Sequence, residues 1–332
     1  MSDRKLPFVS IIVPVYGMSE TIEKCVESLL NLNYSDYEII IVNDKTPDNS
    51  SEIVSRVLSK YPVEVINRPE RKGISSARND GVKASKGIII AFTDADCTVD
   101  RNWLRELVKN YEIHKEKAGG VGGIIKTPPK AKLFEKCVGT LDMPNPAYLS
   151  GNLAMSIAGA NSSYPRKTIE RIGGWDEEII WGGDDVDFNF KVRKEGLSLV
   201  VEPKAIVYHH HRQDPIGFLK WRMKSGESTF HTFLKYPKMY SRVKSSIEKS
   251  SKFILGTGIF TGLAFFASIL VWLLSKLMSC FNTTVHNERV VRILALPIIY
   301  LSYFAGFFGL HIAYRRFSSK KTIKRKSEKE QE

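Results

Sequence analysis

The sequence predicts an α/β fold, in which a mostly parallel sheet is flanked by helices, followed by two C-terminal transmembrane helices. Three observations carry this prediction. Strand-like and helix-like segments alternate over residues 8–211, the strand-like runs are apolar almost throughout, and two long uncharged segments lie near the C-terminus. Alternation with continuously apolar strands is typical of parallel sheets that helices cover on both faces. Uncharged segments of this length are typical of bilayer-spanning helices.

Four apolar runs predict the strands of the sheet, at 8–14, 37–42, 63–66 and 88–92. Apolar residues at helical spacing predict a first helix after the first strand, through Ile22, Cys25, Val26, Leu29 and Leu30. Ligands of such folds bind beyond the carboxyl ends of the strands. No glycine-rich dinucleotide fingerprint follows the first strand, which argues against a dinucleotide-binding domain.

Polar residues mark the starts of three further helices. Asn49 and Glu52 resemble a capping box, and Asp100 is the expected cap of a helix that buries Trp103. A later helix opens at Asp184 and is expected to end at Gly196. We expect its inward-facing residues to include Val186, Phe190 and Leu197.

Charge and cysteine content narrow the classes of function. The 332-residue chain has a net charge of +13, concentrated toward its C-terminal part, and no recognisable nucleic-acid-binding module accompanies it. We therefore expect no nucleic-acid partner. The four cysteines have neither paired nor metal-ligand spacing, which indicates free thiols in a reducing compartment. The N-terminus has no apolar signal region, so the catalytic part is expected in the cytosol.

Two uncharged segments near the C-terminus predict an integral protein of the cell membrane. Residues 253–275 form a run of 23 residues, which as a helix would be roughly 34 Å long, and 293–314 form the second run. A pair of buried core helices is the alternative. Basic residues outside both runs place the two ends in the cytosol. In order along the chain, we therefore expect a cytosolic catalytic domain (1–212), a basic amphipathic juxtamembrane segment (213–252), a transmembrane helix (253–275), an extracytoplasmic loop (276–292), a second transmembrane helix (293–314) and a basic cytosolic tail (315–332).

The sequence Thr93-Asp94-Ala95-Asp96 directly follows the fourth predicted strand. Alternation in an extended segment sends the side chains of Asp94 and Asp96 to the same side. Two carboxylates there suit Mg²⁺ or Mn²⁺, with a substrate diphosphate completing the oxygen ligands. The alternative is an acidic turn without a ligand. One histidine of His209-His210-His211 is a further candidate metal ligand, and surface histidines are the alternative; we choose His209.

A second acidic cluster, Gly182-Gly183-Asp184-Asp185-Val186-Asp187, opens a predicted helix. Crowded carboxylates raise one another's pKa, which suits a general base, although carboxylates at a helix start are also ordinary caps. Trp181 is either an acceptor platform or part of the core. Asp44 ends the second strand and could accept the imide N–H of a uracil, or belong to a turn. Tyr16 either stacks on the base or packs.

Taken together, these segments resemble the family 2 glycosyltransferases, inverting enzymes of the A-type glycosyltransferase fold. The matching segments, which together span residues 7–212, are 9–16, 38–44, Gly73-Ile74-Ser75-Ser76-Ala77-Arg78-Asn79, Asp94-Ala95-Asp96, Gly173-Gly174-Trp175-Asp176-Glu177 and 183–188. Three segments depart from the family pattern: Gly17-Met18, Asn43-Asp44-Lys45-Thr46, and Asp184 in place of a glutamate. The first two departures concern the preference for the nucleotide.

The resemblance implies a role for each matched residue. Pro14, Tyr16 and Asp44 would hold the nucleotide, and Arg78 would lie near the nucleotide or its diphosphate. Asp94 would bind both nucleotide and metal, and Asp96 the metal. Asp184 would contact substrate, and Asp185 would be the catalytic base.

The predicted function is that of a membrane-anchored, metal-dependent, inverting glycosyltransferase of the hexosyl- or N-acetylhexosaminyl-transferase class. It would use a nucleoside-diphosphate sugar and a hydroxyl of a lipid-linked or cell-envelope glycan. One alternative is a polyprenyl-phosphate monosaccharide synthase, whose phosphate acceptor needs no dedicated base. The other is a non-catalytic membrane scaffold that binds nucleotide sugar.

Overall fold

The computed structural model describes residues 6–45, 50–142, 148–150, 152–180, 182–211 and 214–236, and scattered residues between 290 and 312. The predicted span at 253–275 lies outside the described residues, and so do Asn49 and Trp181. The predicted span at 293–314 is described in part, and its described residues are helical. Within the described part of the chain, no helix is both long enough and apolar enough to cross a membrane.

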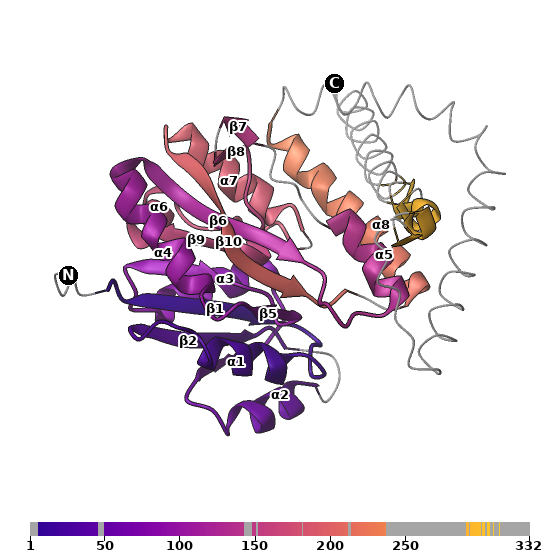
Figure 1. The fold of residues 1–332 in the computed structure, drawn as a ribbon, viewed down its shortest axis with the longest axis horizontal. Coiled ribbons are helices and arrows are strands. Elements are labelled where there is room, and N and C mark those ends of the chain that lie inside the picture. The colour runs from indigo at the N-terminus through magenta and orange to yellow at the C-terminus, as the bar shows by residue number, and fades with distance from the viewer. Residues whose placement is uncertain are drawn as a thin grey trace, which may run out of the picture. The chain divides into compact units, whose positions relative to one another are not determined.

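The described strands form one mixed sheet (Figure 1). Its order is β3-β2-β1-β4-β9-β6-β10-β8-β7, and β5 pairs with β10. The strands are β1 (Val9–Val15), β2 (Tyr37–Asn43), β3 (Glu64–Asn67), β4 (Ile89–Phe92), β5 (Cys97–Val99), β6 (Ala118–Lys126), β7 (Tyr148–Ser150), β8 (Leu153–Ala154), β9 (Ser162–Pro165) and β10 (Ser198–His209).

The prediction of a mostly parallel sheet is right for the N-terminal strands and for β6 with β10, which also pair in parallel, and the other described ladders are antiparallel. β1 pairs in parallel with β2 and β4, and β2 pairs in parallel with β3. β9 then runs antiparallel between β4 and β6, and β5 and β8 run antiparallel to β10. The apolar-run criterion missed this half because β9 reads Ser-Ser-Tyr-Pro and β6 contains four glycines among its nine residues.

Six helices cover the two faces of the sheet. They are α1 (Ile22–Leu30), α2 (Ser50–Leu58), α3 (Ile74–Ala84), α4 (Trp103–His114), α6 (Arg166–Ile172) and α7 (Asp184–Lys194), with short 3-10 turns at Lys115–Lys117 and Gly159–Asn161. The described chain also contains α5 (Leu133–Asp142) and α8 (Pro215–Leu234). The predicted periodicity of α1 is confirmed, because Ile22, Cys25, Val26 and Leu29 are all buried.

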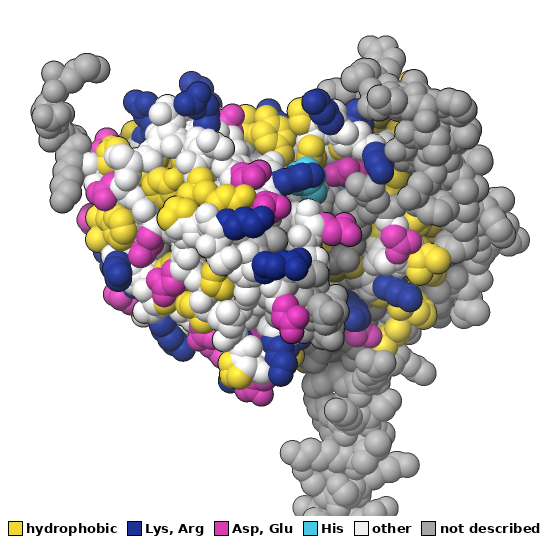
Figure 2. Space-filling model, turned by 90° about the horizontal axis from the view of Figure 1, so that it is seen from below, with side chains coloured by type: hydrophobic (Ala, Val, Ile, Leu, Met, Phe, Trp, Pro, Cys, Tyr) yellow, Lys and Arg dark blue, Asp and Glu magenta, His cyan; other side chains and the backbone are white. Residues whose placement is uncertain are grey.

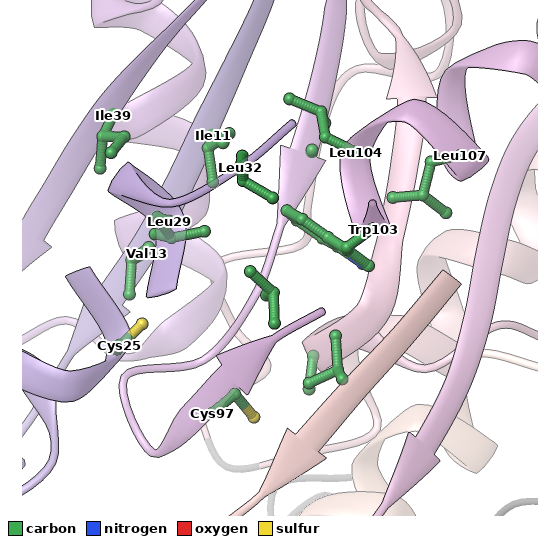
Figure 3. Packing of buried hydrophobic residues seen from close by; sticks show 14 of the residues in the cluster. Ile11, Val13, Cys25, Leu29, Leu32, Ile39, Cys97, Trp103, Leu104 and Leu107 are labelled. Carbon is green, nitrogen blue, oxygen red and sulfur yellow. The ribbon is translucent and has the colours of Figure 1, made fainter. Parts of the chain in front are cut away.

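Two apolar cores lie on opposite faces of the sheet, because alternate residues of each strand point to opposite sides. In the first core, Ile11 and Val13 of β1 pack with α1, α2 and α4, and Trp103 is fully buried there (Figure 3). In the second core, Ile12 of β1 packs with residues of α3, α6 and α7. The strands are therefore buried on both faces, as their continuous apolar runs predict.

The predicted inward face of α7 is wrong. Val186 and Phe190 are 42% and 36% exposed, and Leu197 lies beyond the end of the helix at Lys194. The apolar side chains that α7 buries are Phe188 and Val192, four residues apart. Asp184, Asp187 and Asn189 are also buried in α7. Because these buried residues are polar, a prediction from apolar spacing selected the wrong face of the helix.

The described chain divides into two compact units. The first contains residues 1–131, 141–180 and 184–211, with the whole sheet. The second contains 132–140, 181–183 and 212–332. Within the second unit, the Ser228 hydroxyl donates to the Gly182 carbonyl at 2.9 Å.

Candidate active site

The sheet opens at the carboxyl end of β1. The ladder between β1 and β4 stops at the pair Ile12–Phe92, whereas the ladder between β1 and β2 continues to Val15–Asn43. Pro14, which has no N–H to donate, lies in the stretch without a β4 partner. Strand order reverses direction at β1, and such a switch point is where open α/β sheets bind ligands.

Pairing between β5 and β10 brings the two predicted metal-binding segments together. His209 faces Cys97 in this antiparallel ladder, so it lies beside the preceding residue, Asp96. Nε2 of His209 lies 3.2 Å from Oδ2 of Asp96. Burial alone would raise the pKa of Asp96, but the charge of His209 and its hydrogen bond hold that pKa below its usual value. His209 therefore lies beside Asp96, and its role as a metal ligand stays a prediction.

Arg78 connects the two acidic clusters. This buried side chain of α3 makes a close ion pair through Nη1 with Oδ2 of Asp184, and its Nη2 lies 3.6 Å from Oδ1 of Asp94. Burial raises the pKa of Asp94, and the nearby Asp96 charge adds to that rise against the opposing effect of Arg78. The predicted substrate residues Arg78, Asp94 and Asp184 thus lie in one contiguous cluster.

The three carboxylates at the start of α7 have different surroundings. Asp184 is buried against Arg78, and Asp187 is buried with an ion pair to Lys191 at 2.9 Å. Asp185 is only partly buried, and its contacts are two backbone N–H groups: Val186 donates to Oδ1 at 2.8 Å, and Gly159 donates to Oδ2 at 3.3 Å. Asp185 is therefore the one of the three whose side chain is partly exposed.

Gly159 lies between the predicted base and the buried arginine. A Cβ atom at this position would come within 2.6 Å of Nη2 of Arg78. Its turn is held by the fully buried Asn161, whose Nδ2 donates to the carbonyls of Ile124 and Ala205 and whose Oδ1 accepts from Trp103. Gly159 and Asn161 could not be predicted as site residues, because no local sequence pattern shows that the Gly159 N–H bonds Asp185.

The α3 segment also holds the Trp175 loop. Asn79 makes three hydrogen bonds of 2.9 Å, from Nδ2 to the Trp175 carbonyl and to Glu177, and to Oδ1 from the Trp175 N–H. Ser75 donates to the Ile179 carbonyl at 2.8 Å. The Trp175 ring stacks on Phe188 of α7 at 3.8 Å. The predicted segments 73–79 and 173–177, which lie far apart in the sequence, are therefore joined by hydrogen bonds.

Asp44 is buried at the end of β2 and has a structural partner there. Its Oδ1 accepts hydrogen bonds from Nη1 of Arg68 at 2.8 Å and from the Lys72 N–H at 2.9 Å, and its Oδ2 accepts from the Gly73 N–H at 2.8 Å. Arg68 follows β3 as Asp44 follows β2, and no motif in the sequence marks it as a partner of Asp44. At the same edge, the guanidinium of Arg71 lies over the Tyr16 ring at 3.8 Å.

The residues present fit a divalent cation. Potential ligand atoms of Asp96, Cys97 and His209 lie within 4.8 Å of one another, and Oδ1 of Asp94 is buried without a hydrogen-bond partner in the described structure. Burial raises the pKa of Cys97 well above its usual value. Carboxylate oxygens and an imidazole nitrogen remain, which are suitable ligands for Mn²⁺ or Mg²⁺.

Comparison with known sequences identifies the class of protein. Residues 10–171 match the family described as Glycosyl transferase family 2. Glycosyltransferase AglE of Haloferax volcanii is 29% identical over 69% of this chain and 75% of its own length. Probable glycosyltransferase YdaM of Bacillus subtilis is 28% identical over 81% of this chain, and the match spans 65% of YdaM, just under two thirds.

Solved structures show the same fold. Mannosyltransferase PcManGT from Pyrobaculum calidifontis, solved with GDP-Man and Mn²⁺, has a TM-score of 0.56 at 17% identity over 83% of this chain and 88% of its own. GalNAc-T7, solved with UDP, GalNAc and Mn²⁺, has a TM-score of 0.51 at 20% identity over 63% of this chain and 45% of its own. The predicted A-type glycosyltransferase fold is confirmed, with a mixed sheet. Residues 10–171 therefore match a glycosyl transferase family 2 domain, and the relatives of that family indicate a transferase.

Proposed function

We propose that this protein is a metal-dependent, inverting glycosyltransferase of the hexosyl- or N-acetylhexosaminyl-transferase class. It moves a sugar from a nucleoside-diphosphate sugar to a hydroxyl of a lipid-linked or cell-envelope glycan. The observation that carries the proposal is the ion cluster in which Arg78 joins Asp94 to Asp184, the neighbour of Asp185. This cluster supports a donor-side role for Asp94 and the role of base for Asp185.

The balance of charge in the cluster supports a cation and a donor diphosphate. Asp94, Asp96, Asp184 and Asp185 contribute four carboxylates, whereas Arg78 supplies one permanent positive charge. Uncompensated negative charge in a partly buried site is unfavourable. Asp96, His209 and Asp94 would hold a divalent cation, which when bound neutralises the charge of the diphosphate leaving group.

The protein's own residues divide the remaining work. Asp185 accepts the proton of the acceptor hydroxyl, and its two backbone N–H contacts fix the orientation of the carboxylate. The deprotonated oxygen forms a bond to sugar C1 as the bond between C1 and the diphosphate oxygen breaks. The nucleoside diphosphate departs from the opposite face, so the anomeric configuration inverts. Pro14, Tyr16 and Asp44 line the nucleotide side, at the open end of β1 and β2.

The acceptor and the membrane location rest on sequence. The uncharged runs at 253–275 and 293–314 support an integral protein of the cell membrane with a cytosolic catalytic domain. A similar protein, the poly-beta-1,6-N-acetyl-D-glucosamine synthase of Staphylococcus aureus, is 24% identical over 70% of this chain and 57% of its own length. The name of that relative supports a glycan acceptor for this protein.

Replacing the base tests the proposal. The full chain in detergent is incubated with a labelled nucleotide-sugar panel, Mn²⁺ and extracted membrane lipids, and transfer to lipid or glycan is measured. We expect Asp185→Asn to lower transfer by about 100-fold or more, the usual effect of removing a general base. Glu116→Gln, which neutralises an exposed carboxylate in the 3-10 turn after α4, is the matched control and should leave transfer unchanged.

The outcomes separate the alternatives. Loss of transfer in Asp185→Asn with donor binding intact supports a hydroxyl acceptor. Undiminished transfer in that variant would contradict the assigned base and favour a polyprenyl-phosphate acceptor, which is already an anion. A folded wild-type protein that binds donors and transfers none of them, even with lipids present, would favour the scaffold.

A further inference from the structure

Asn189 joins helix α7 to the loop that contacts the predicted base. Its side chain is fully buried, and its Nδ2 donates to the Ser156 hydroxyl at 2.9 Å and to the Ile157 carbonyl at 2.7 Å. Its Oδ1 accepts a hydrogen bond from the Tyr164 hydroxyl at 2.9 Å. Because a carbonyl can only accept, the bond to Ile157 fixes which end of the amide faces the loop.

The same loop donates a hydrogen bond to Asp185. Asp185 and Asn189 lie four residues apart on α7, which makes them neighbours on the surface of the helix. The Gly159 N–H, two residues after Ile157, donates to Oδ2 of Asp185 at 3.3 Å. One turn of α7 therefore holds residues 156–159 at two points, through the amide of Asn189 and through the carboxylate of Asp185.

The bond between Gly159 and Asp185 depends on where the loop lies. At 3.3 Å it is already at the long end of the range for an N–H donor, so a further shift of about 0.3 Å would break it. Gly159 also lies close to Arg78, since a Cβ atom there would come within 2.6 Å of Nη2. Movement of the loop would therefore change the surroundings of both side chains.

We propose that Asn189 is a positioning residue for Asp185. It fixes the loop so that the Gly159 N–H holds the carboxylate in the orientation that accepts a proton from the acceptor hydroxyl. Asn189 is buried, so it acts through the loop and through Asp185, without touching substrate. The proposal rests on the proposed function, because it takes Asp185 as the base. A catalytic group misplaced by about 1 Å can cost roughly 100-fold in rate, so a buried amide that holds the base in place can control turnover.

Replacing Asn189 alone and together with Asp185 tests the proposal. Transfer from the nucleotide sugar that the wild type uses is measured with the full chain in detergent, Mn²⁺ and extracted membrane lipids. Leucine keeps the volume of Asn189 without its hydrogen bonds, so Asn189→Leu releases the loop without opening a cavity. We expect this variant to lower kcat by about tenfold or more and to leave the KM for the donor unchanged. In the Asp185→Asn background, the same replacement should lower transfer by less than about twofold further, because residues that act as a unit are not additive.

A second buried asparagine separates positioning from general stability. Asn110 of α4 is 3% exposed, and its Nδ2 donates to the Glu106 carbonyl and to Glu202, both at 3.0 Å. Asn110→Leu should therefore lower the midpoint of urea denaturation about as much as Asn189→Leu does, whereas its kcat should stay at the wild-type value. An equal fall of kcat in the two variants would show that lost stability explains the effect, and would overturn the proposal.

The double variant distinguishes failure of this proposal from failure of the proposed function. Additive losses of transfer would overturn the positioning role while leaving Asp185 as the base. Undiminished transfer in Asp185→Asn would remove the base, and the positioning role with it. If Asn189→Leu does not fold, Ser156→Ala removes only one bond from Nδ2, and we expect a loss of about threefold or more that is again absent in the Asp185→Asn background. Wild-type transfer by a folded Ser156→Ala variant would then overturn the proposal.

Discussion

At the scale of single residues, two neighbouring carboxylates of α7 have different surroundings. Asp184 is 5% exposed and pairs with the buried Arg78, whereas Asp185 is partly exposed and accepts hydrogen bonds from two backbone N–H groups. Their sequence context is the same, so the division follows from which side of the first helical turn faces the core. A helix start that resembles an ordinary acidic cap thus supplies a structural ion pair through Asp184, and we propose that it supplies the catalytic base through Asp185.

This division predicts different responses to the same chemical change. Asp184→Asn leaves Arg78 buried without its close partner, and we expect the free energy of unfolding to fall by about 3 kcal/mol. Asp185→Asn removes no ion pair, so it should change stability by less than about 0.5 kcal/mol. Urea denaturation of the full chain, followed by tryptophan fluorescence, measures both. Equal destabilisation by the two variants would contradict the assigned division.

At the scale of elements, α3 acts as the connector of the active site. From one helix, Asn79 holds the Trp175 loop and Arg78 holds the start of α7. Gly174 has a φ of +75°, and a Cβ there would come within 2.7 Å of Oδ1 of Asn79. The loop can therefore approach the helix this closely only with glycine at that position.

Removing the connector should loosen the loop. Asn79→Ala breaks three hydrogen bonds of 2.9 Å, and we expect a loss of about 2–4 kcal/mol in unfolding free energy, at roughly 1 kcal/mol for each bond. Asn33→Ala, which removes an exposed side-chain bond of 3.2 Å to Asn102, is the matched control and should cost less than about 0.5 kcal/mol. Chemical denaturation of both variants gives the comparison. A loss no greater than that of the control would remove the connector role of Asn79.

Elements that have a clear local pattern could be predicted from the sequence. The strand that ends before Asp94 and the helix at Ile22 both follow from runs and spacings within a few residues. The antiparallel β9 and the inward face of α7 could not be predicted, because polar residues are buried there by distant partners: Tyr164 donates to Asn189 at 2.9 Å. The contact between Asp96 and His209 was a choice among three histidines, and only the pairing of β5 with β10 selects His209.

At the scale of the whole molecule, charge and burial set how the fold responds to its surroundings. On the face shown in Figure 2, the basic and acidic side chains of the described residues are interspersed, without a broad basic patch. The second core buries Tyr164, and burial raises its pKa above the usual tyrosine value, as it does for Tyr111 beside the first core. Both hydroxyls are hydrogen-bonded, to Asn189 and Ser163.

These tyrosines predict a loss of stability in alkali. Above about pH 10, tyrosines of the unfolded chain release protons that the folded chain retains, so the free energy of unfolding falls as pH rises. Each buried tyrosine contributes a slope of about 1.4 kcal/mol per pH unit. Unfolding measured at about pH 9 and about pH 11, either side of the usual tyrosine pKa, should show a smaller drop for Tyr164→Phe than for the wild type. Identical drops would show that Tyr164 ionises freely in the folded state.

The most direct measurement of the central claim is metal-dependent release of nucleoside diphosphate from nucleotide sugars by the full chain in detergent. We predict release from one class of donor with Mn²⁺ or Mg²⁺, its loss on chelation, and a fall of about 100-fold or more in Asp96→Ala, since the metal supplies several kcal/mol of charge stabilisation. Glu116→Ala, at an exposed carboxylate, should match the wild type. Release that survives both chelation and Asp96→Ala would contradict a catalytic metal held by Asp96 and His209.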